Sequence, residues 1–290
     1  MKKKPSISRG RDPLMRKGTS PTDSSTVDSV AFQTLISEGK TEQALKLSEE
    51  ILEKSRKLTN RNFVGEAWIR MERALLGAIN LEDVGNELRW CVDRLASVSP
   101  GSPLHGLSLL NLAAWHRNSN EEMMALVTLS EISSDSGHPV DLIGLSRLES
   151  GRILVEIGDI EPAMRHLWMA MRRLSSVEMP AEAVVCAMEW LDLALDDIDP
   201  DSPTMDERIV NAKPRESPGM TLSPSNPSDI RESVEIILSN GLRDVSGVRR
   251  DDLGLVLDAS DALGEPLWRE SIEERQREIQ DSRLIEVLQS

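Results

Sequence analysis

Amphipathic helical stripes recur along this sequence at a nearly constant spacing, and this recurrence strongly constrains the fold. The small or apolar residue that begins the inner face of each second helix falls at Ala44, Val84, Met123 and Ala163, at intervals of 40, 39 and 40 residues. A fixed period in the range of roughly 20–50 residues is typical of a solenoid, in which each helix pair buries its apolar face only by stacking on its neighbours. The sequence therefore predicts an all-α protein, a right-handed α-solenoid of about four to five helix-pair repeats with a C-terminal helical section.

Capping residues and helix-ending glycines set the boundaries of the predicted helices. Ser102 is suited to cap a helix that has Pro103 at its first position, and Gly39 and Gly158 each end a helix. Short breaks separate these segments, so they are interpreted as helix pairs. The expected helices cover residues 28–37, 41–57, 62–78, 80–98, 103–116, 120–133, 139–157, 160–174 and 181–197.

Composition divides the chain into four parts. Residues 1–26 are rich in Ser, Pro and basic side chains and are predicted to form a disordered basic tail, whereas residues 27–198 hold the helical repeats. Residues 199–228 contain six of the fifteen prolines and little apolar content, which predicts a disordered linker or long loop. Residues 229–290 are expected to be a helical section that caps the solenoid. Its predicted helices lie near residues 229–240, 250–263 and 266–288.

Two stretches of the repeat region resemble a known helical repeat. Residues 150–163 read Ser-Gly-Arg-Ile-Leu-Val-Glu-Ile-Gly-Asp-Ile-Glu-Pro-Ala, and residues 37–45 read Ser-Glu-Gly-Lys-Thr-Glu-Gln-Ala-Leu. Both resemble the middle of a tetratricopeptide repeat (TPR), in which a small residue, a Gly-Asp turn and an Ala let two helices approach closely. Trp68 also stands where that family often has a Trp. The resemblance covers residues 28–197. It implies a concave surface that binds a peptide or another protein, without catalysis of its own.

The sequence shows no pattern of catalytic or metal-binding residues. The four histidines lack partners at metal-ligand spacing, and no GxSxG, GxxxxGK[ST] or GxGxxG motif occurs. Cys91 and Cys186 lie in apolar helical runs and are interpreted as reduced core residues. Most of the six tryptophans, and methionines such as Met123 and Met124, are interpreted as packing residues. We therefore expect a protein that is not an enzyme and that has no cofactor and no metal.

The inner surfaces of the first helices remain as the candidate binding site. The positions expected to be buried are Trp68, Met71, Leu75, Leu107, Leu110, Ala114, Ser150 and Leu154. The positions then expected to line a groove are Arg70, Arg73, His105, Trp115, His116, Arg152 and Glu156. The three arginines favour an acidic or carboxylate-bearing partner segment. The alternative is that they only pair with neighbouring glutamates, namely Glu66, Glu72, Glu149 or Glu156.

The leading hypothesis is a cytoplasmic, non-enzymatic scaffold or adaptor that holds a protein or peptide segment in a concave helical groove. No apolar run approaches the ~20 residues that span a bilayer, and no apolar segment of a signal peptide follows the first lysines. The net charge of −15 repels phosphate backbones, so nucleic acid is expected as a partner only through the basic tail. Two alternatives stay open. One is an enzyme or regulatory enzyme subunit with a site between the repeats and the C-terminal helices, and the other is association of the tail with nucleic acid, a ribosome or a membrane surface.

Overall fold

The computed structural model describes residues 25–57, 59, 61–213, 224–240 and 250–274. Within these residues the regular elements are helices, and the one β-type contact is an isolated bridge between Ile198 and Ser225. The predicted all-α fold is therefore confirmed for this part of the chain. The helices fall into two compact units, Met1–Leu142 and Ile143–Ser290. No helix among the described residues is both long enough and apolar enough to cross a bilayer.

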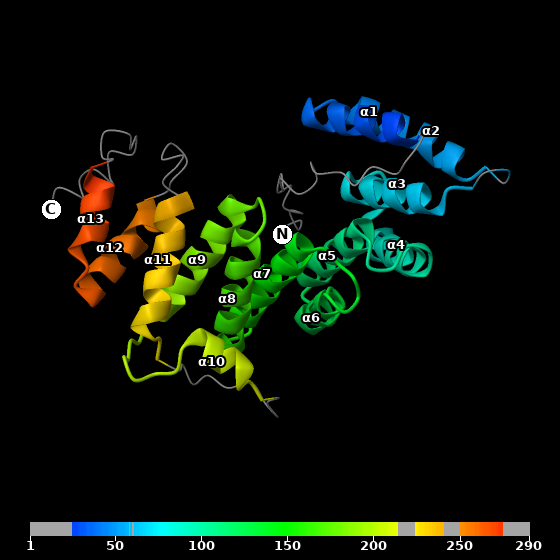
Figure 1. Cartoon of the computed structure of the whole chain (residues 1–290). Coiled ribbons are helices and arrows are strands. Elements are labelled where there is room, and N and C mark those ends of the chain that lie inside the picture. Colours follow the sequence, from blue (N-terminus) through cyan, green and yellow to red (C-terminus); the bar gives the residue numbers. More distant parts are fainter. Residues whose placement is uncertain (1–24, 58, 60, 214–223, 241–249, 275–290) are drawn as a thin grey trace, which may run out of the picture. The chain divides into compact units, whose positions relative to one another are not determined.

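Each helix of the first unit packs against the next one in the chain (Figure 1). The elements are α1 (Ser25–Ser37), α2 (Thr41–Ser55), α3 (Phe63–Leu75), the short 3-10 helix η3 (Leu81–Asp83), α4 (Val84–Val98), α5 (Pro103–Asn118) and α6 (Glu122–Ser130).

Local signals explain where these helices begin and end. The Ser102 side chain accepts a hydrogen bond from the backbone N–H of His105 at 3.2 Å, so it caps α5 as predicted. Asn62 caps α3 in the same way, through the N–H of Gly65 at 2.9 Å. Gly39 ends α1 with a φ of 74°, a left-handed conformation that glycine adopts without steric cost. Asn80 precedes η3 rather than capping α4 directly, and its side chain makes no capping hydrogen bond.

The buried stripe of α6 differs from the prediction. Ala44, Val84 and Ala163 are buried as expected, but Met123 is 66% exposed and Ala125 is the fully buried residue of that helix. The reason lies in the sequence of α6, where apolar residues occupy several faces and leave the register ambiguous from spacing alone. The position assigned to Met123 is therefore wrong by two residues.

The second unit contains most of α7 (Val140–Glu156), which begins at the unit boundary. Helix α9 packs against both α8 and α11, α11 contacts α12, and α12 contacts α13 (Figure 1). The further elements are α8 (Ile160–Ser175), α9 (Pro180–Ala194), α10 (Met205–Val210), α11 (Pro227–Asn240), α12 (Arg250–Leu263) and α13 (Pro266–Glu273).

Small residues and tryptophans build the core of this unit. A Cβ atom on Gly144 would lie 2.7 Å from the Leu174 side chain, and a Cβ atom on Gly151 would lie 2.8 Å from the Leu167 side chain. The two glycines therefore let α7 and α8 approach closely. Between α8 and α9 the rings of Trp168 and Trp190 pack with their centres 4.9 Å apart, and both are fully buried. Such aromatic pairs add roughly 0.5–1.5 kcal/mol beyond the burial of their surface.

Helix α10 lies inside the segment 199–228, for which a disordered linker or long loop was predicted. Thr204 and Glu207 form a reciprocal capping box at its start, and Met205 is fully buried. Arg208 forms a buried ion pair with Glu161 of α8. These few anchoring residues make residues 205–210 helical. The sequence did not predict this helix because the surrounding segment is rich in proline. Residues 214–223 of this segment lie outside the described residues, as do residues 1–24 of the predicted tail and residues 275–288 of the last predicted helix.

Candidate functional site

Arg70 and Arg73, two of the predicted groove residues, lie on α3 and are held by carboxylates and a hydroxyl of neighbouring helices. Arg70 binds Glu87 of α4, with 2.6 Å between Nη2 and Oε2. Arg73 donates to the Ser48 hydroxyl of α2 at 2.7 Å. Burial opposes ionisation of Arg70, but its hydrogen bonds and the charge of Glu87 raise its pKa above the ordinary value. Arg70 therefore pairs with glutamates, as the alternative interpretation of the sequence expected. Its principal partner is Glu87 on the next helix, and Glu66 on its own helix lies 3.7 Å away.

The register predicted for α5 is corrected by the structure. Leu109, Leu112 and Ala113 are buried, whereas Ala114 is exposed. As a consequence His105 and His116 are buried and do not line a surface. The leucines of α5 occupy several faces of the helix, so spacing alone did not identify its inner side.

Trp115 is partly exposed and packs against α4. A Cβ atom on Gly85 would overlap the Trp115 ring, including a separation of 2.7 Å from Cε2. The neighbouring His116 is placed edge-on to the Trp115 ring at 5.1 Å and binds the Glu121 carboxylate at 2.6 Å. Trp115 therefore serves close packing between α4 and α5.

His105 forms a buried pair with His138, which sequence reasoning did not anticipate. His105 Nδ1 accepts the N–H of Gly101 at 3.2 Å, and His138 Nδ1 accepts the N–H of Ser133 at 3.3 Å. His138 Nε2 must then carry the proton that it donates to His105 Nδ1 at 3.1 Å. Burial, together with the charge of His138, lowers the pKa of His105. The pair joins the start of α5 and the preceding loop at 99–102 to the loop at 133–139.

Arg152 and Glu156 lie on α7 in the second unit. Arg152 forms a bidentate ion pair with Glu189 of α9, with 2.6 Å from Nη2 to Oε1 and 3.0 Å from Nε to Oε2, and also contacts Glu149 at 2.7 Å. These two carboxylates raise the pKa of Arg152 above its ordinary value against the effect of burial. Glu156 is exposed. The Arg152 side chain thus connects α7 to α9.

Five residues of the first unit form a continuous series of cation–π contacts across α3 and α4. The guanidinium carbons of Arg61 and Arg94 lie 4.8 Å and 4.9 Å from the centre of the Phe63 ring. Arg94 also lies 5.2 Å from the centre of the Trp90 ring, on which Arg70 stacks at 3.6 Å. Each such contact contributes roughly 0.5–1 kcal/mol at exposed sites. None of the five residues is buried, and we call them the arginine–aromatic surface.

Positive charge exceeds negative charge at this surface. Glu66, whose side chain is 1% exposed, lies beneath Arg56, Arg61 and Arg70 at 3.0 Å, 3.0 Å and 3.7 Å. Burial works to raise the pKa of Glu66, but the hydrogen bonds and charges of Arg56 and Arg61 hold it below the ordinary value. With Glu87 bound to Arg70, both carboxylates of the surface are already engaged by arginines.

Arg94 differs from the other arginines of the surface because no described carboxylate forms an ion pair with it. Its Nε atom is buried and has no hydrogen-bond partner among the described residues. The side chain is instead held by the Phe63 and Trp90 rings. Arg94 therefore presents a fixed, planar and uncompensated positive charge.

Sequence reasoning identified only Arg70 of this surface as a site residue. Trp90 and Arg94 are four residues apart on a predicted helix, and this spacing could have shown that they share a face. The contact between Phe63 and Arg94 joins α3 to α4, so no regular spacing within one helix could have predicted it. It becomes visible only once α3 and α4 are packed together.

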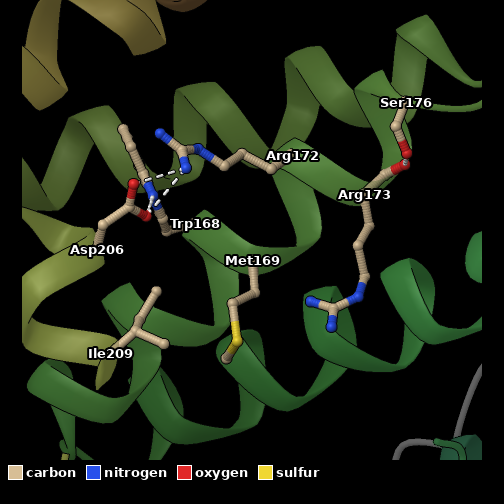
Figure 2. A pocket seen from close by; sticks show the side chains of 7 residues that line it. All are labelled: Trp168, Met169, Arg172, Arg173, Ser176, Asp206 and Ile209. Carbon is tan, nitrogen blue, oxygen red and sulfur yellow. Dashed lines mark hydrogen bonds and ion pairs between the residues drawn. The ribbon is translucent and has the colours of Figure 1, made fainter. Parts of the chain in front are cut away.

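The second unit has a hollow of about 350 Å³ between α8 and α10. We call it the α8–α10 hollow, and Figure 2 shows the residues that line it. Arg172 reaches across to Asp206 at 2.7 Å and also binds Glu232 at 2.8 Å. The lining residues are Trp168, Met169, Arg172, Arg173, Ser176, Asp206 and Ile209.

Groups that commonly carry catalysis or bind metals are dispersed or buried in the described part of the chain. No three His, Cys, Asp or Glu side chains come together there in a way that holds a metal ion. Cys91 and Cys186 are buried free thiols. Burial raises the pKa of Cys91 to about 12 and also raises the pKa of Cys186. Neither thiol has the lowered pKa of a reactive cysteine.

Comparison of the sequence with models of known protein families gives no match, and comparison with curated proteins gives none either. The geometry of the described residues is therefore the basis for a functional assignment.

Proposed function

We propose that this chain is a non-enzymatic interaction protein that binds an acidic segment of another protein on the arginine–aromatic surface. The observation that carries the proposal is Arg94, which is held between two aromatic rings and has no described carboxylate as a partner. A partly exposed arginine fixed in this way loses little conformational freedom when a ligand binds it.

The chemistry of the surface favours carboxylates flanked by apolar side chains. A guanidinium group donates parallel hydrogen bonds to a carboxylate, and such charge-assisted bonds are about twice as strong as neutral ones. Phe63 and Trp90 offer partly exposed ring surface beside that charge. The net charge of −15 repels a polyanion such as nucleic acid over most of the molecule, so a short acidic segment fits better.

The TPR-like solenoid and a cytoplasmic location belong to the same proposal. Consecutive α-helices of the first unit pack side by side, as do α8 and α9 of the second unit, which supports a helical repeat. The turns of the two stretches that resemble TPRs contain Gly39 and Gly158, and both glycines end a helix with a positive φ. An interaction module of this class presents an extended surface and needs no catalytic group.

Fluorescence anisotropy with the full-length chain tests the proposal. The probe is a short labelled peptide of Glu and Leu residues, and a peptide of Gln and Leu residues controls for charge. Arg94→Gln should weaken binding of the acidic peptide by about tenfold, because it removes charge-assisted hydrogen bonds. The exposed Arg89→Gln on the same helix removes the same charge outside the surface and should change affinity much less.

Unfolding measurements on the same proteins establish whether the fold is intact. Arg89→Gln, at an exposed position, should change stability by no more than about 0.5 kcal/mol. Equal affinity of Arg94→Gln and Arg89→Gln for the acidic peptide, or equal binding of the two peptides, would contradict the assignment.

A further inference from the structure

The two arginines that line the α8–α10 hollow differ in whether carboxylates pair with them. Arg172 is neutralised by Asp206 and Glu232. No described carboxylate forms an ion pair with Arg173, the next residue of α8. Figure 2 shows Arg172 reaching toward Asp206, whereas Arg173 and Met169 extend from α8 in another direction. The hollow therefore contains one cation whose charge is not balanced by a described carboxylate.

Positive charge accumulates around Arg173. A Cβ atom on Gly144 of α7 would lie 3.5 Å from the Arg173 Cβ, which places Arg173 against α7. One turn after Gly144, Arg147 has a buried Nε atom without a hydrogen-bond partner among the described residues. The Nδ1 atom of His166 on α8 is also buried and also has no such partner. No described carboxylate pairs with Arg147 or with Arg165.

Burial and the mutual repulsion of these groups lower the pKa values of Arg147 and His166. Burial and the charge of Arg173 lower the pKa of Arg147. Burial and the charges of Arg147 and Arg165 lower the pKa of His166 to about 4. An anion bound beside Arg173 would reduce this repulsion, and the gain is largest where solvent screening is weak.

Apolar groups line the rest of the hollow. Met169 and Ile209 are partly exposed there, on α8 and α10 respectively. The volume of about 350 Å³ lies at the lower end of the range for sites that hold small molecules. Asp206 also lines the hollow, and its carboxylate disfavours a ligand with several negative charges.

We propose that the α8–α10 hollow binds a small organic monocarboxylate, with the carboxylate on Arg173 and its apolar body against Met169 and Ile209. This site is independent of the acidic-segment proposal, since it lies in the second unit and uses different residues. The expected ligand class is an aromatic or branched aliphatic acid.

Ligand-observed NMR on the full-length chain tests this site with three probes. Phenylacetate carries both the charge and the apolar body, phenylacetamide lacks the charge, and acetate lacks the body. We expect phenylacetate to bind most tightly. Arg173→Gln should weaken the binding of phenylacetate by at least about fivefold, since it removes a charge-assisted hydrogen bond. Arg89→Gln, at an exposed position of α4 in the first unit, removes the same charge outside the hollow and should leave the affinity for phenylacetate within about twofold.

A second variant separates loss of the site from loss of the fold. Met169→Glu places a carboxylate one helical turn before Arg173, in the favourable order for an ion pair, and should prevent phenylacetate from binding while the helix is retained. Absence of phenylacetate binding, equal phenylacetate affinity of Arg173→Gln and Arg89→Gln, or equal affinity of the wild type for phenylacetate and phenylacetamide would overturn the proposal.

Discussion

Two residues of the first unit, Gly85 and Glu72, show how single positions are determined by their surroundings. Gly85 lies inside α4 where a Cβ would overlap the Trp115 ring of α5, so close packing requires glycine despite its low helix propensity. Glu72 is buried on α3, and burial raises its pKa to about 7 against the opposing effect of a hydrogen bond from Trp68. Each residue gives a prediction whose sign depends on this environment.

Gly85→Ala should destabilise the chain by about 1–3 kcal/mol, because the added methyl group overfills the contact with Trp115. Gly254→Ala on α12 is the matched control, since a Cβ there meets no atom within 4 Å. That change should stabilise by about 0.5–1 kcal/mol through helix propensity. Urea unfolding gives both values. A gain in stability from Gly85→Ala would show that α4 and α5 are not packed as described.

The stability contribution of Glu72 should depend on pH. Its folded-state pKa of about 7 exceeds the usual 4.5, so the neutral form suits the fold, and stability is lost as pH rises through this interval. Glu72→Gln removes the ionisation. The stability of this variant relative to wild type should therefore increase between pH 5 and pH 8, by up to about 3 kcal/mol.

Urea unfolding at both pH values measures this change, with the exposed Glu82→Gln as the control. A relative stability of Glu72→Gln that is the same at the two pH values would mean that Glu72 is ionised in the folded protein.

At the scale of elements, residues with local effects were predictable and residues with long-range contacts were not. Ser102 and Gly39 act on their own backbone, and the helix boundaries that they predict are confirmed. The burial of Ala125 in place of Met123 depends on which face of α6 meets α5, and spacing does not decide that in a helix with apolar residues on several sides. Helix α10 depends on contacts with α8 that follow only from the packed structure.

The same limit applied to the candidate site. Arg70 was found because it lies beside a clear apolar stripe, whereas Arg94 is defined by a ring on another helix. His105 was placed in a groove because its partner His138 comes from a distant loop. Sequence patterns thus predicted the elements well, whereas Phe63, Trp90 and Arg94 were not among the predicted groove residues.

The His105–His138 pair connects two loops and should make that connection sensitive to acid. The lowered pKa of His105 means that the fold favours its neutral form, so the stabilisation is present above the unfolded value of about 6.5 and is lost as pH falls below it. His105→Asn keeps an acceptor for the N–H of Gly101 but does not titrate in this range.

Hydrogen exchange of the Gly101 amide, corrected for intrinsic rate, measures the effect. Its protection should fall between pH 7.5 and pH 5.5 in wild type and fall less in His105→Asn. Equal loss of protection in the two proteins would exclude His105 as the cause.

Over the whole molecule, the charge distribution supports the proposal that an acidic segment binds at the arginine–aromatic surface. The chain has 49 acidic and 34 basic Lys or Arg residues, so most of its surface repels an acidic partner. Arg61, Arg70 and Arg94 reverse that sign locally, and interactions of exposed charges decay over about 8–10 Å at physiological salt. An acidic segment that touches this surface therefore meets local positive charge.

NMR of the indole N–H signals of the six tryptophans in the full-length chain tests whether an acidic segment binds at the arginine–aromatic surface. Variants at single tryptophans assign the signals, and the acidic peptide of Glu and Leu residues is then titrated in. The Trp90 signal should shift progressively, whereas the signals of the buried Trp168 and Trp190 should stay in place. Arg94→Gln should reduce the Trp90 shift at each peptide concentration. Saturable peptide binding that leaves the Trp90 signal unchanged would show that the acidic segment binds elsewhere.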